Sequence, residues 1–175
     1  PPAPVPAPFP IDPIKREVVE LVERRFASHP GRLDPAALPA TAADAEALWR
    51  FAREACLPCF GPYEDAMSTR SSTLFHTRLS ALLNNGRLLP RRVVEEAARL
   101  PIPIASREGF VRQILGWREF MRHVHVATDG LRTLPPGFRF NPLGAAAPLP
   151  PAFWGERSGL HCLDRVVAEV WDTGY

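Results

Sequence analysis

The chain has 175 residues, enough for one domain with a hydrophobic core and too few for two domains unless both are small. It contains no apolar run of about 18 residues, so the sequence predicts no transmembrane helix and no membrane partner. The formal net charge of +2 is divided unevenly: residues 1–66 carry seven basic and ten acidic side chains, and residues 67–175 carry fourteen and nine. The basic half permits nucleic-acid binding without requiring it.

The cysteine content and the first residues indicate the cellular compartment. Three cysteines, an odd number, occur in a chain whose first ten residues lack the charged and apolar segments of a secretory signal peptide. This combination favours a reducing, cytoplasmic setting. Every basic residue except Lys15 is arginine, which suits bidentate phosphate contacts, although a GC-rich genome would also favour arginine codons.

The N-terminal region is rich in proline. The high proline content predicts that residues 1–11 form an extended interdomain linker. A helical domain is predicted to follow over residues 12–175. Asp12 is predicted to cap a helix that Pro13 opens. A second helix is predicted to begin at the cap Thr41 and to end before Pro58, with Trp49 in the core.

Cys56 and Cys59 form a C-x-x-C pair at the end of this second helical pattern. Reactive pairs of this kind gain their low thiol pKa at the start of a helix. A zinc site would need two further ligands from a matching motif, and none is visible. The sequence therefore favours neither a redox site nor a metal site here.

Residues 72–92 form the most informative stretch. The hydroxyl groups of residues 71–73 are predicted to cap a helix, and apolar side chains at helical spacing predict its buried face, namely Leu74, Phe75, Leu79, Leu82 and Leu83. Gly86 is expected to end this helix and Pro90 to open the next one. Three polar residues interleave with the apolar face and are either solvated or turned towards a ligand: His76, Thr77 and Ser80.

A longer helix is predicted over residues 107–127, capped by Ser106 after an extended linker at residues 101–104. Its apolar positions include Phe110 and Ile114, with Trp117 on the flank. Three polar side chains of this helix are expected to turn inward: Gln113, Arg118 and Glu119.

Residues 130–151 read as a long loop, and a last helix is predicted from about Cys162 to Thr173. Its buried side is expected to consist of Val166, Val167 and Val170. Capped amphipathic helices account for most of the chain and no alternating strand pattern appears. The sequence therefore predicts an all-α, multi-helical fold.

Two of these segments resemble motifs of the photolyase and cryptochrome family. Residues 77–80, Thr-Arg-Leu-Ser, followed by Leu83, Gly86 and a proline-led helix, are similar to the (T)S-x-L-S-P-x-L-x-x-G segment that holds the FAD phosphates and ribityl chain. Residues 117–120, Trp-Arg-Glu-Phe, look like the family's WREF motif. The stretches L-F-H-x-x-L-S and R-Q-x-x-G-W-R-E-F are similar to the bacterial iron–sulfur branch, which contains the prokaryotic (6-4) photolyases and cryptochrome-like proteins.

This resemblance implies that the chain is the N-terminal part of the helical FAD-binding domain. The residues that would line the flavin are His76, Thr77, Leu79, Ser80, Gln113 and Arg118. Tyr63, in a stretch similar to F-G-x-Y-x-D-A-M, would either approach a cofactor phosphate or pack on the surface with a solvated hydroxyl. Trp117 would line the lesion pocket, where flipped-out bases stack on it. Trp154 is either a packing residue or a relay in the electron-transfer path to FAD.

Cys162 lies in a G-x-x-C-L-D context, which in the iron–sulfur branch supplies the first ligand of a [4Fe–4S] cluster. Four thiolates are needed, so the other three ligands would come from outside this chain. Without the resemblance, a lone cysteine at such a place reads as a small buried hydrophobe.

The activity that the resemblance implies is blue-light-driven repair of UV-damaged DNA, in which reduced FAD lends an electron to a damaged pyrimidine pair. Ile114 stands three residues before Trp117, where the pyrimidine-dimer photolyases carry a glutamate, and this departure favours the (6-4) type or a photosensor. The alternatives are therefore a cryptochrome-like regulator without repair activity, and a helical interaction module without a cofactor. We expect an N-terminal antenna domain with its chromophore and the rest of the flavin pocket to lie outside the chain, which alone would show little or no activity.

Overall fold

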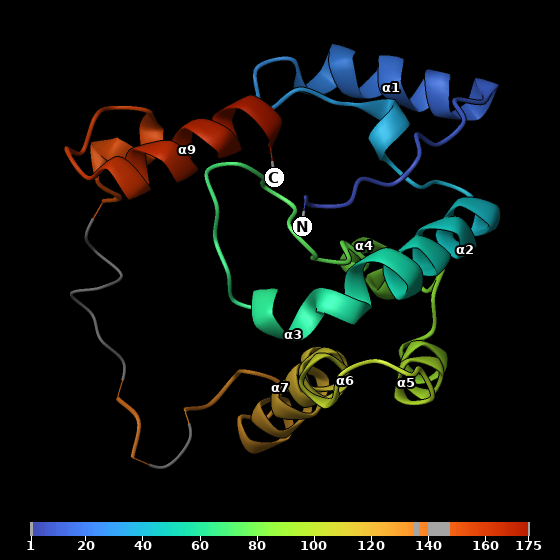
Figure 1. Ribbon diagram of the computed structural model, residues 1–175. Helices are drawn as coiled ribbons and strands as arrows, with labels where there is room; N and C mark the ends of the chain where they lie inside the picture. The colour runs from blue at the N-terminus through green and yellow to red at the C-terminus, as the bar shows by residue number, and fades with distance from the viewer. Residues whose placement is uncertain (1, 135–136, 140–147, 175) are drawn as a thin grey trace. The chain divides into compact units, whose positions relative to one another are not determined.

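All regular structure in the described part of the chain is helical (Figure 1). The computed structural model describes residues 2–134, 137–139 and 148–174. The α-helices are α1 (Pro13–Phe26), α2 (Ala42–Phe51), α3 (Phe60–Tyr63), α4 (Ser80–Asn84), α5 (Pro90–Ala98), α6 (Ile104–Val111), α7 (Trp117–Ala127) and α9 (His161–Thr173). Short 3₁₀ segments are η1 (Pro35–Ala37), η3 (Leu57–Cys59) and η5 (Pro151–Trp154), and π-helical turns are η2 (Ala52–Cys56) and η4 (Arg112–Gly116). The prediction of an all-α fold is confirmed.

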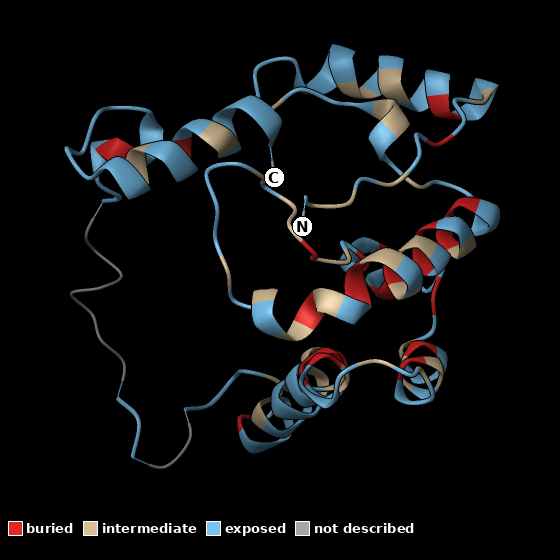
Figure 2. Ribbon diagram, viewed as in Figure 1, coloured by how far each residue is buried: buried red, intermediate tan, exposed pale blue. Residues whose placement is uncertain are grey.

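The chain folds into two compact units. The first comprises Pro1–Pro8 and Pro39–Gly137 and contains α2 to α7; the second comprises Phe9–Leu38 and Phe138–Tyr175 and contains α1 and α9. Within the first unit, the buried positions follow one side of α2, α5 and α6 (Figure 2). Among the described helices, none combines the length and the apolar character needed to cross a membrane.

The start of α1 in the second unit is built as the sequence predicts. The Asp12 carboxylate accepts a hydrogen bond from the Lys15 backbone N–H at 2.7 Å, which confirms the cap. Residues 2–11 contain no helix, and Phe9 is buried. The apolar stripe of α1 is largely exposed within its unit, at Ile14, Val18, Leu21 and Phe26.

Two glycines allow the chain after α1 to meet the end of α9. The Gly31 backbone N–H donates to the Trp171 carbonyl at 2.9 Å. Gly31 has a φ of +97°, and a Cβ at this position would lie 2.6 Å from the Cα of Gly174. Any residue with a side chain would therefore adopt an unfavourable backbone conformation at this position, and its Cβ would clash with the Gly174 backbone. On α9 itself only Val167 of the three predicted valines is buried, so that part of the prediction is wrong for the other two.

Aromatic packing forms the core of the first unit. Trp49 on α2 is fully buried, as predicted, and stacks on Phe110 of α6 with ring centroids 6.0 Å apart. Phe60 of α3 meets the same Phe110 ring edge-on at 5.6 Å. Thr41 caps α2 through a reciprocal capping box with Asp44, which confirms the predicted start of this helix. This aromatic core joins α2, α3 and α6.

The predicted helix from residue 72 is wrong in its first half. Helical structure begins only at Ser80, because Leu74 and Arg78 have φ values of +41° and +54°. The Ser71 hydroxyl oxygen accepts hydrogen bonds from the backbone N–H groups of Thr73 and Leu74 and so stabilises a local turn instead of capping a helix. The end is as predicted: Gly86 has a φ of +75° and Pro90 is the first residue of α5.

The long helix forms, but it begins earlier than predicted. It runs from Ile104 through α6, η4 and α7 to Ala127. Ser106 lies inside it, fully buried, and its hydroxyl oxygen accepts the Gly61 backbone N–H at 2.9 Å, so the predicted cap is wrong. Glu119 is exposed and pairs with Arg122, so its predicted inward orientation is also wrong.

Candidate functional site

The loop between α3 and α4 carries the first set of predicted site residues. His76 Nε2 lies 2.9 Å from the Tyr63 carbonyl oxygen and donates to it, because a carbonyl oxygen can only accept. The Tyr63 ring packs against Phe75 with centroids 4.6 Å apart. Phe75 is buried, so it anchors the loop in the core of the unit. Tyr63 and His76, separated by 13 residues in the sequence, are therefore brought together.

The remaining polar residues of this loop differ in accessibility. Thr77 is half-buried and Ser80 is exposed at the start of α4. Leu79 is only 2% exposed, so its side chain belongs to the core and a ligand could reach it only through the backbone. The positive φ of Arg78 turns the backbone between Thr77 and Leu79 away from a helical path.

The second set of site residues lies where η4 passes into α7. Gln113 Nε2 donates to the Glu64 carboxylate at 2.6 Å, and Gln113 Oε1 accepts from Trp117 Nε1 at 2.8 Å. Arg112 pairs with the same carboxylate at 3.2 Å. Arg118 is half-buried and donates to the Ile114 carbonyl at 2.8 Å. Glu64 was not expected in the site; it occupies a variable position of the F-G-x-Y-x-D-A-M stretch.

Trp117 presents an open aromatic surface in the first unit. It is 59% exposed, and its ring meets Phe120, which is 56% exposed, edge-on at 6.0 Å. Exposed aromatic rings of this kind are suited to stacking against bases. Sequence reasoning did not select Phe120, although it is the last residue of the WREF segment.

The two motif segments meet through neighbouring residues at the end of α3. Tyr63 accepts from His76 of the loop, and Glu64 accepts from Gln113 of the long helix. The same two segments also carry the hydroxyls of Thr77 and Ser80 and the guanidinium of Arg118, which donates to the Ile114 carbonyl. Such donors fit phosphate and hydroxyl oxygens, the groups that a flavin dinucleotide carries.

Cys162 lies in the second unit, exposed in the first turn of α9. The turn before it is fixed by Asp164, whose carboxylate accepts the Ser158 hydroxyl and backbone N–H at 2.6 and 2.8 Å. These hydrogen bonds lower the pKa of the Asp164 carboxyl. In the part of the chain that the structure describes, no group of three or more His, Cys, Asp or Glu residues could hold a metal ion.

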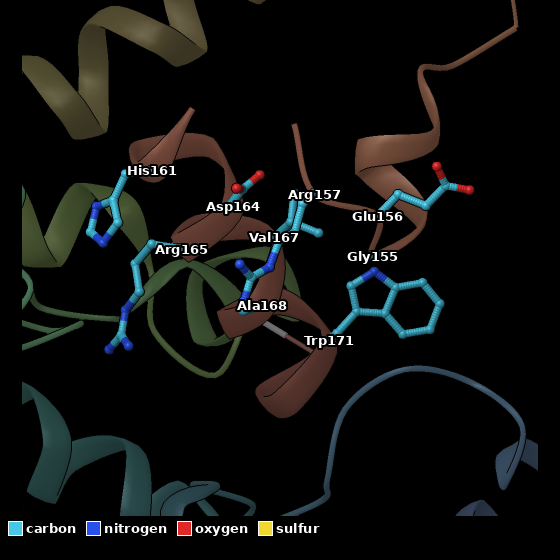
Figure 3. Close-up of a pocket in the computed structure, with 9 residues that line it drawn as sticks. All are labelled: Gly155, Glu156, Arg157, His161, Asp164, Arg165, Val167, Ala168 and Trp171. Carbon is cyan, nitrogen blue, oxygen red and sulfur yellow. The ribbon is translucent and has the colours of Figure 1, made fainter. Parts of the chain in front are cut away.

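Trp154 is 65% exposed at the end of η5, so it does not act as a core residue within the second unit. A cavity of about 650 Å³ lies on α9 and the residues just before it in the same unit (Figure 3). The cavity mixes acidic, basic and aromatic side chains and is lined by Gly155, Glu156, Arg157, His161, Asp164, Arg165, Val167, Ala168 and Trp171. None of the predicted site residues lines it.

The C-x-x-C pair does not have the properties of a reactive dithiol. Cys56 is 1% exposed, and burial raises the pKa of its thiol to about 11, with a smaller contribution from the charge of Cys59. A thiol with a raised pKa stays protonated at neutral pH and is a poor nucleophile. The raised pKa argues against a redox role for this pair, which the sequence did not favour either.

Comparison with known proteins adds a relative that spans nearly the whole chain. A (6-4) photolyase of Agrobacterium fabrum is 32% identical over 171 residues, which cover 95% of this chain and 33% of that protein. The chain therefore spans about a third of the length of this curated relative. No protein-family model matches the chain.

Proposed function

The chain belongs to the photolyase family, and on that premise we propose that it forms part of the helical flavin-binding domain of a light-driven DNA repair enzyme of the (6-4) type. Residues 12–175 would belong to this domain and residues 1–11 to the linker before it. The observation that carries the proposal is the meeting of the flavin-type loop and the WREF-type helix at Tyr63 and Glu64. The similarity to a (6-4) photolyase over 95% of the chain supports the lesion type.

The chain's own residues would bind and orient the flavin. The hydroxyls of Thr77 and Ser80 can donate hydrogen bonds to phosphate oxygens, and the Arg118 guanidinium can donate to a phosphate or a ring oxygen. His76 would act through the loop, since its Nε2 is engaged by the Tyr63 carbonyl. When bound and reduced, FAD supplies the electron that the lesion borrows, and the protein supplies binding and orientation.

Trp117 would form the lesion side of the site. Its exposed ring, together with Phe120, offers a surface on which a flipped-out pyrimidine pair can stack, as enzymes that act on bases require. UV-damaged DNA is therefore the proposed substrate. The excess of basic side chains in residues 67–175 would favour the phosphate backbone of that DNA.

Cys162 would supply one thiolate to a [4Fe–4S] cluster whose other ligands lie elsewhere in the polypeptide. Its exposure in the first turn of α9 leaves its sulfur accessible within this unit. Trp154 is the proposed relay for electrons that reduce the flavin. The antenna chromophore would likewise be bound outside this chain.

Flavin content of the full-length protein tests the assigned donors. Arg118→Ala should weaken FAD binding about tenfold, the factor expected for one lost charge-assisted hydrogen bond. The matched control is Arg122→Ala on the same helix, whose side chain pairs only with Glu119 among the contacts described and is exposed. Equal FAD affinity in the two variants would remove Arg118 from the flavin site.

An absorption spectrum of the anaerobically purified full-length protein tests the cofactors. We expect flavin bands together with a broad iron–sulfur shoulder that disappears in Cys162→Ser. Flavin bands whose shoulder survives in Cys162→Ser, or that have no shoulder, would contradict the role of Cys162. A colourless protein that gains no stability from added FAD would favour a helical interaction module instead.

A further inference from the structure

Glu64, Gln113 and Trp117 form a directed chain of hydrogen bonds in the first unit. A carboxylate can only accept, so Gln113 must turn its NH₂ group towards Glu64, which lies 2.6 Å away. This fixes the amide oxygen of Gln113 on the opposite side, where it accepts the indole N–H of Trp117 at 2.8 Å. The opposite amide orientation would place oxygen against oxygen and N–H against N–H. Glu64 therefore determines which hydrogen bond Gln113 can offer to the indole.

The backbone holds the three residues in register. Gln113 lies in the π-helical turn η4, whose hydrogen bonds run from residue i to i+5 and give it one more residue than an α-helical turn. Residues four apart lie on one face of a helix, and the hydrogen bond shows that Gln113 and Trp117 meet on that face. Ile114, the next residue, is buried and points into the core, which leaves Gln113 at the edge.

Space for the carboxylate comes from a glycine. The Glu64 side chain is 10% exposed and its carboxylate lies against Gly109 on α6, so closely that a Cβ at residue 109 would overlap a carboxylate oxygen. The Arg112 guanidinium, which is 64% exposed, pairs with the same carboxylate oxygen that Gln113 contacts. The carboxylate is thus enclosed, neutralised and aimed at Gln113.

We propose that Glu64 and Gln113 are positioning residues that hold the Trp117 ring in the orientation in which it receives a lesion. This inference rests on the proposed function, because it takes Trp117 as the stacking surface. Trp117 is 59% exposed, and the contacts described for its ring are the Gln113 hydrogen bond and the edge of Phe120. Without the hydrogen bond the ring would be free to rotate about its side-chain bonds, and binding would have to order it again.

The test uses the full-length protein labelled with nitrogen-15 at tryptophan only. The indole N–H resonance of Trp117 is assigned with Trp117→Phe and is followed in Glu64→Ala and Glu64→Gln. Alanine should shift the resonance towards the position of a free indole and weaken binding of a (6-4) lesion oligonucleotide about fivefold, the factor of one ordinary hydrogen bond. Glutamine should restore both readouts, because its amide oxygen still accepts from Gln113.

Two further variants complete the experiment. Gly109→Ala leaves Glu64 in the chain but displaces its carboxylate, and it should reproduce the Glu64→Ala shift. Glu108→Ala removes an exposed carboxylate from the neighbouring position of α6 and should change neither readout. An unchanged Trp117 resonance in Glu64→Ala would overturn the inference. If the wild-type protein bound damaged and undamaged DNA equally, the proposed function would fail, while the resonance would still decide whether the pair holds the ring.

Discussion

Replacing Glu96 by alanine should loosen the scaffold that carries the site. The Glu96 carboxylate on α5 accepts from Trp49 Nε1 at 2.7 Å and pairs with Arg53 at 3.0 Å and with Arg92 at 2.7 Å. Trp49 is fully buried, so its indole N–H would be left without an acceptor, at a cost of about 1–3 kcal/mol. The two partly exposed ion pairs add roughly 0.2–1 kcal/mol each. We expect a loss of about 2–4 kcal/mol in local stability.

Hydrogen exchange of peptides from α2 and α5 in the full-length protein measures this loss as a free energy of local opening. The matched control is Glu95→Ala at the neighbouring residue, which pairs with the highly exposed Arg91, and it should leave the opening free energy close to that of the wild type. Equal effects of the two substitutions would refute the argument, because they would mean that the buried indole N–H does not depend on Glu96.

The interactions of the Glu96 carboxylate also predict that the stability of the first unit depends on pH. Burial alone would raise the pKa of the Glu96 carboxyl, but hydrogen bonds from Trp49 and Arg92 outweigh it, and the pKa lies below its ordinary value of 4.5. Because the folded-state pKa is the lower one, the stabilisation is present above the unfolded-state pKa and is lost as the pH falls through the folded-state pKa. The difference in stability between wild type and Glu96→Ala should therefore shrink as the pH falls below 4.5. An undiminished difference in strong acid would contradict the role of the ionised carboxylate.

Three further outcomes are expected. Ser106→Ala should destabilise the first unit by about 1–3 kcal/mol in urea unfolding, because the Gly61 N–H loses its acceptor; a loss below 0.5 kcal/mol, roughly that of a surface change, would argue against this. Cys56 should resist iodoacetamide at pH 8 in the native protein, given its raised pKa of about 11, and react only in denaturant; labelling of the native protein would show that the thiol is accessible. Trp117→Ala should weaken binding of lesion DNA by about 1–3 kcal/mol in a fluorescence titration and should spare binding to undamaged duplex; equal losses would point to a general DNA contact.

Local signals in the sequence predicted several helix boundaries correctly. The caps at Asp12 and Thr41 involve hydrogen bonds within three residues, so the pattern around each residue contains the information needed. Gly86 correctly predicted the end of α4, because glycine tolerates a positive φ. Pro90 correctly predicted the start of α5, because proline lacks an N–H that would need a partner in the first turn.

The start of α4 shows where local patterns fail. The helical spacing of Phe75 and Leu79 correctly predicted that both are buried, yet the backbone that brings them there is not helical. The Ser71 turn and the positive φ of Leu74 and Arg78 replace the first helical turns. Two buried side chains can be placed in the core by more than one backbone conformation. Their spacing in the sequence alone does not determine which conformation forms.

For the candidate site, too, the sequence predicted some features and missed others. The motifs predicted that the loop and the long helix would be parts of one site, which stays a prediction; in the structure His76 of the loop contacts Tyr63 and Gln113 of the long helix contacts Glu64. The contact of Glu64 with Gln113 was not predicted, because the two residues are 49 positions apart in the sequence and neither residue type indicates such a pairing. Periodicity also predicted apolar faces on α7 and α9 without showing what covers them, and most of those side chains are exposed within their own units.

Light-driven repair by the full-length protein tests the central claim most directly. A short duplex with one (6-4) lesion is illuminated with blue light in the presence of the reduced protein, and restored pyrimidines are quantified by chromatography against a dark control. We expect restoration in the light only, and a lower yield for Trp117→Ala at equal flavin content and subsaturating DNA. A flavin-loaded protein that restores no lesion in the light would contradict the repair function and favour a photosensor.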